Sequence, residues 1–100
     1  GTLLVRLLDE ATGKPIAGMA YAAPVDREVA AHRFPGFVYR AGSAASGEAE
    51  EGILLRALVP GEEHRVRARA EGYVPAERDD VLPSGASEPP VELVLRLRRR

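Results

Sequence analysis

Apolar and polar residues alternate in several short runs along the chain, and turn-forming residues separate these runs. In residues 64–70, HRVRARA, every second residue from Val66 onward is apolar, and arginines stand between them. Residues 91–97, VELVLRL, alternate in the same way and place Val91 and Leu93 on one face. A period of two is that of a β-strand with one buried face and one face in water.

The other segments predict further short elements. We expect strands at residues 2–8, at 16–24, around 53–55 within 48–58, and at a sheet edge in 78–82. Residues 26–32 fit one or two helical turns, 34–40 fit a short strand, and 41–47 fit a flexible loop. Turns at about every 8–12 residues, without a long helical period, predict an all-β fold. The specific prediction is a seven-stranded antiparallel Greek-key β-sandwich, transthyretin-like or immunoglobulin-like.

The sharpest turn signal is Val59-Pro60-Gly61-Glu62. Proline sets φ at the second position of a type II turn, and glycine accepts the positive φ of the third. We expect the strands before and after this turn to pair as an antiparallel hairpin. Residues 9–15, DEATGKP, also contain glycine and proline and predict a turn earlier in the chain.

Length and composition limit the classes of function. One hundred residues suffice for one domain, and the chain begins at Gly1 and enters a strand at once, so we interpret 1–100 as a single domain excised from a longer protein. The net charge is −1, which gives no overall attraction to nucleic acid. The absence of cysteine excludes disulfides and thiolate chemistry. No apolar run reaches the roughly 18 residues of a membrane span, so we expect no direct membrane insertion.

Four segments, taken in order, resemble a known family. They are DEATGKPIAGM (9–19), EGILLRALVPG (51–61), HRVRARAEGY (64–73) and VELVLRL (91–97). Together they resemble the carboxypeptidase regulatory-like domain, one of the transthyretin-like sandwiches. The departures are Met19 in place of the usual alanine, Glu51-Gly52 in place of Asp-Gly, and residues 25–46, which do not align. The resemblance implies a non-catalytic module of a secreted, periplasmic or surface protein.

Few residues are candidates for catalysis or metal binding. His32 and His64 are too far apart for a metal-ligand spacing, and His64 follows a turn, so we expect it to lie in water. The serines stand in loops without the motif of a nucleophile elbow. We therefore predict no catalytic, cofactor-binding or metal-binding residue, and we interpret the chain as a protein that is not an enzyme.

Two surface features remain. The first is the row of arginines at 65, 67 and 69, which we interpret as a solvated face paired with acids at 48, 50 and 51. The second is the aromatic cluster Phe34, Phe37 and Tyr39. These three side chains either cap the core or face outward as a partner-binding patch, since aromatic residues anchor interfaces at low entropic cost.

These observations predict an accessory or adaptor module that binds a protein partner or neighbouring domains of its parent chain. The arginine-rich composition, with Lys14 as the single lysine, indicates a GC-rich genome, and with the resemblance it points to a bacterial envelope, surface or secreted assembly. One alternative is a carbohydrate- or ligand-binding module that uses Tyr21, Tyr39 or Tyr73 with acidic groups. Another is a pure spacer. No cofactor and no nucleic-acid partner is expected.

Overall fold

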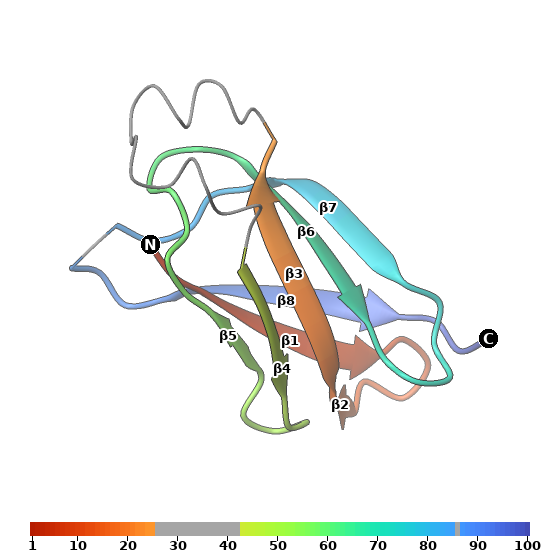
Figure 1. Ribbon diagram of the computed structural model, residues 1–100. Helices are drawn as coiled ribbons and strands as arrows, with labels where there is room; N and C mark the ends of the chain where they lie inside the picture. The colour runs from red at the N-terminus through yellow and green to blue at the C-terminus, as the bar shows by residue number, and fades with distance from the viewer. Residues whose placement is uncertain (26–42, 86) are drawn as a thin grey trace.

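The computed structural model describes residues 1–25, 43–85 and 87–100, and these residues form two β-sheets without a helix (Figure 1). The first sheet contains β1 (Leu3–Asp9), β2 (Pro15–Ile16), β5 (Ile53–Leu55) and β8 (Val91–Leu97). The second contains β3 (Gly18–Pro24), β4 (Ser43–Gly47), β6 (His64–Arg69) and β7 (Ala76–Val81), in the order β4-β3-β6-β7. The predicted all-β class is confirmed.

Strand β1 is the centre of the first sheet. Strand β8 pairs with β1 over its whole length, from Leu3 opposite Val91 to Asp9 opposite Leu97, and this pair is parallel. Strands β2 and β5 pair antiparallel with different parts of β1, so they share its other edge. All pairs in the second sheet are antiparallel. Antiparallel pairing therefore dominates the described strands, as expected, and β1–β8 is the exception.

The core lies between the two sheets in a sandwich-like arrangement. Burial alternates along β1 and β6, as the period of two predicts for a strand with one buried face. The buried side chains come from both sheets and from the connection after β5; they are Leu3, Val5, Leu7, Ala20, Ala22, Ile53, Leu55, Leu58, Val66, Ala68, Val81, Leu93, Leu95 and Leu97. Val91 shares the parity of Leu93 but is 40 % exposed, so the buried side of β8 begins at Leu93.

The expected hairpin across Pro60-Gly61 is wrong, although the turn itself is present. Gly61 has φ 76°, and the Glu62 amide donates to the Val59 carbonyl at 3.4 Å. However, β5 pairs with β1 in the first sheet, whereas β6 pairs with β3 and β7 in the second. The connection crosses between the sheets because the apolar side chains of Leu58 and Val59 enter the core, each 2 % exposed.

Two more expectations need correction. Residues 16–24 are not one strand, because β2 and β3 belong to different sheets and the chain changes sheet at Ala17. Residues 43–47 are not a loop but β4, which pairs with β3 from Gly18 opposite Gly47 onward. With these two elements the described residues contain eight strands. The helical turns predicted at 26–32 and the strand predicted at 34–40 lie outside the described residues.

Gly47, at the end of β4, lies close to the backbone of Gly52 and Ile53. A Cβ atom at this position would lie 2.1 Å from the carbonyl oxygen of Gly52. We expect Gly47→Ala to lower the free energy of unfolding by about 1–3 kcal/mol, because backbone atoms would have to separate. Urea unfolding measures this loss, and Ser46→Ala, at an exposed position of the same strand, is the control. Equal midpoints for the two variants would contradict the predicted contact.

Candidate functional site

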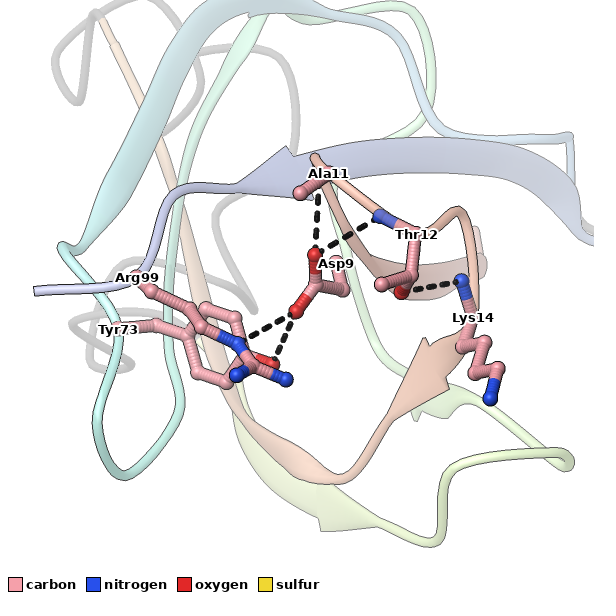
Figure 2. A network of polar contacts seen from close by, with 6 residues as sticks. All are labelled: Asp9, Ala11, Thr12, Lys14, Tyr73 and Arg99. Carbon is pink, nitrogen blue, oxygen red and sulfur yellow. Dashed lines mark hydrogen bonds and ion pairs between the residues drawn. The ribbon is translucent and has the colours of Figure 1, made fainter.

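The most strongly perturbed acid of the described residues is Asp9, at the end of β1 (Figure 2). Its side chain is buried, and each carboxylate oxygen accepts two hydrogen bonds. Oδ1 accepts from the backbone amides of Ala11 at 2.8 Å and Thr12 at 3.1 Å. Oδ2 accepts from the Tyr73 hydroxyl at 2.7 Å and from Nε of Arg99 at 2.9 Å. We call these five residues the Asp9 clasp.

The clasp keeps a buried carboxylate in its charged form. The hydrogen bond from Tyr73 is the largest influence and holds the pKa of Asp9 well below its ordinary value. The donors at Thr12, Arg99 and Ala11 act in the same direction, and together they outweigh burial, which raises the pKa. Both ordinary acceptor positions of each oxygen are occupied, so the carboxylate is placed to join segments rather than to take a proton from a substrate.

Sequence reasoning missed the clasp. It treated residues 9–15 as a turn and named Tyr73 as a candidate aromatic residue of a ligand-binding module. One local signal was available: an aspartate that ends an apolar strand and enters a turn commonly accepts hydrogen bonds from the amides two and three residues ahead. The bonds to Tyr73 and Arg99 have no such local signal, because they join residues that are distant along the chain.

His64 lies in the core, and the expectation that it lies in water is wrong. It is 0 % exposed and shares the inward face of β6 with Val66. Its Nε2 accepts a hydrogen bond from the Val59 amide at 3.3 Å, so Nδ1 carries the proton and donates to the Glu62 carbonyl at 2.8 Å. Burial lowers the pKa of His64. The ring therefore closes the turn between the sheets, with both of its nitrogens engaged.

Ser84 and the potential metal ligands of the described residues have structural surroundings. Ser84 is buried, and its hydroxyl contacts the backbone and side chain of Thr2, at 3.2 Å and 2.9 Å, rather than a base. Within residues 1–25, 43–85 and 87–100, no three His, Cys, Asp or Glu side chains are grouped closely enough to hold a metal ion. In the same residues, no helix is long and apolar enough to cross a membrane.

The outward side of the second sheet carries exposed apolar side chains next to arginines. Along β3 and the residue after it, Met19, Tyr21 and Val25 are 47 %, 41 % and 46 % exposed. The adjacent strand β6 presents its three arginines outward. The register places Met19 opposite Arg69, Tyr21 opposite Arg67, and Ala23 opposite Arg65. We call these seven residues the β3–β6 face; the two strands lie side by side in Figure 1.

Three hollows follow one another along this face. The central one, of about 370 Å³, is lined by Met19, Ala20, Tyr21, Arg67 and Arg69. A second, of about 440 Å³, shares Tyr21 and Arg67 with it, and a third, of about 220 Å³, shares Met19 and Arg69. The cross-strand pairs Tyr21–Arg67 and Met19–Arg69 are therefore the walls between neighbouring hollows.

The arginines of this face differ in their partners. Arg65 lies 3.6 Å from both Glu77 and Asp79 on β7, and not beside the acids of residues 48–51 to which it was assigned. The reason is that β6 pairs with β7 and not with the segment before the turn. Arg67 and Arg69 form no ion pair in the part of the chain that the structure describes. They are two exposed cations beside exposed apolar side chains.

The aromatic patch predicted from sequence, Phe34, Phe37 and Tyr39, lies outside the described residues. Comparison with known proteins gives no family assignment: no family model matches the chain, and no curated protein matches it. The resemblance to the carboxypeptidase regulatory-like domain therefore stays a prediction that depends on the four motifs. The candidate functional site with the clearest physical basis is the β3–β6 face.

Proposed function

We propose that this chain is a non-catalytic β-sandwich module that serves as an accessory or adaptor domain by binding a protein partner. The observation that carries the proposal is the β3–β6 face, where Met19 and Tyr21 are exposed beside arginines. Methionine, aromatic residues and arginine are enriched at protein interfaces relative to the rest of the surface. The occupied hydrogen-bonding positions of Asp9 and His64 support a structural role for both groups.

We also propose that the fold is a seven-stranded transthyretin-like Greek key of the carboxypeptidase regulatory-like kind. On this view β2, with two residues, is a short addition to the seven longer strands. The order of the motifs supports the family, and the family implies a secreted, periplasmic or surface protein. The arginine-rich composition adds a bacterial origin to this proposal. The partner would be another protein of that assembly or a neighbouring domain of the parent chain.

Affinity capture from native extract tests the proposal. We expect wild type to retain a specific protein, and the double variant Met19→Ser/Tyr21→Ser to lose it. Val94→Ser removes an equally exposed apolar side chain from the other sheet and is the matched control. Unfolding curves must show that all variants fold. Loss of the partner with Val94→Ser alone, or with Phe34→Ser, Phe37→Ser and Tyr39→Ser combined, would move the interface away from the β3–β6 face.

A ligand-binding role is the second candidate, because the hollow of about 440 Å³ falls within the usual size of ligand pockets. It is lined by Tyr21, two arginines and Glu77, which combine an aromatic ring with charged groups. Tyr73, in contrast, is committed to the Asp9 clasp. Saturable binding in a glycan array, removed by Tyr21→Ser, would favour this role over the protein-binding one.

A further inference from the structure

The hollows along the β3–β6 face repeat at the spacing of alternate side chains in an extended peptide. Successive outward positions on a strand lie about 6.8 Å apart, because a strand rises about 3.4 Å per residue. The two walls between the three hollows stand at successive outward positions, Met19–Arg69 and Tyr21–Arg67. A peptide in extended conformation also directs every second side chain to the same side. Laid along β3 and β6, it would direct three alternate side chains into three successive hollows.

The charge of the hollows differs along this row. The central hollow is lined by two arginines and by no acid. The hollow of about 440 Å³ is lined by Glu77 beside its two arginines, and the hollow of about 220 Å³ by Glu71 beside Arg69. An anionic side chain is therefore most favoured in the centre, where no acid opposes it, and the outer hollows add apolar contacts with Val25 or Met19.

We propose that the occupant of the β3–β6 face is an extended segment of a partner protein with the pattern apolar-x-acidic-x-apolar. The acidic side chain lies between Arg67 and Arg69, and the apolar side chains fill the outer hollows. Guanidinium groups form strong charge-assisted hydrogen bonds with carboxylates, and the apolar walls of Met19 and Tyr21 keep this pair partly out of water. This inference rests on the proposed function and adds the chemistry of the partner.

A labelled peptide with the sequence Gly-Ser-Leu-Ser-Glu-Ser-Leu-Ser-Gly is the probe, and fluorescence anisotropy with the whole chain is the measurement. We expect saturable binding, which becomes at least about tenfold weaker when the central Glu is replaced by Gln or when Arg67→Ala/Arg69→Ala is used. Arg96→Ala, which removes an exposed arginine from β8 in the other sheet, is the matched control and should change the affinity less than about twofold, because Arg96 lies outside the β3–β6 face. Replacing both peptide leucines by serine should also weaken binding.

A charge exchange makes the test specific. Arg67→Glu/Arg69→Glu should lose the Glu peptide and gain a peptide with Lys at the centre. Equal binding of the Glu and Gln peptides, or no binding of either by folded wild type, would overturn the inference. If capture of a protein in native extract still depended on Met19 and Tyr21, the proposed function would stand without it. Preferential binding of an oligonucleotide, or a dimer of this chain disrupted by the arginine variants, would also overturn it.

Discussion

Asp9→Asn is expected to lower the melting temperature by on the order of 10 °C, because it removes a buried charge on which four donors converge. An amide side chain has one oxygen in place of two, and its NH₂ group would face donors at Tyr73 and Arg99 or at the turn amides. Thermal unfolding followed by circular dichroism measures the effect. Asp80→Asn is the control: Asp80 contacts Arg78 in water, so its loss should leave the transition nearly unchanged.

The charged carboxylate of Asp9 also predicts that the stability of the fold depends on pH under acidic conditions. The pKa of Asp9 is lowered in the folded state from an ordinary value of 3.8, so the unfolded chain binds a proton more readily than the folded chain. The stabilisation is complete above pH 3.8 and is lost as the pH falls from there toward the lowered folded-state pKa. Wild type should therefore lose stability more steeply below pH 4 than Asp9→Asn does. Parallel pH profiles for the two proteins would contradict a charged Asp9.

The alternation of apolar and polar residues predicted where the strands lie better than it predicted which strands pair. It located β6 and β8 and the outward row of arginines, because a period of two directly reports which face is buried, whereas β1 was predicted from an apolar run. It could not report pairing, since the turn at Pro60-Gly61 fits a hairpin and a crossing between sheets equally well. The wrong hairpin then produced the wrong acidic partners for Arg65, which depend on which strand lies beside β6.

The Asp9 clasp and the burial of His64 illustrate two different limits of prediction from sequence. Asp9 is separated from Tyr73 by 64 positions and from Arg99 by 90, so no local pattern brings them together. The burial of His64, in contrast, was contained in the alternation, because position 64 shares its parity with Val66 and Ala68. The adjacent turn favours exposure to water, but here the turn itself supplies the hydrogen-bond partners of the buried ring.

We expect a second large effect from His64→Ala, which should lower the free energy of unfolding by about 2–4 kcal/mol. The substitution leaves a cavity in the core, and it leaves the Val59 amide and the Glu62 carbonyl without their partner. His64→Gln offers an acceptor near the position of Nε2 and a donor on the same side chain. It should therefore lose less stability than His64→Ala, as urea unfolding at pH 7.5 would measure.

The pH dependence separates the imidazole from a merely space-filling group. Burial lowers the pKa of His64 below the ordinary 6.5, so stability is complete above pH 6.5 and falls as the pH drops toward the folded-state pKa, by at most about 1.4 kcal/mol per pH unit. Protonation of Nε2 would also set two donors against each other at Val59. His64→Gln should remove this part of the profile, and His32→Gln should retain it. If His32→Gln removed this part of the profile and His64→Gln retained it, the titration would belong to His32 and not to His64.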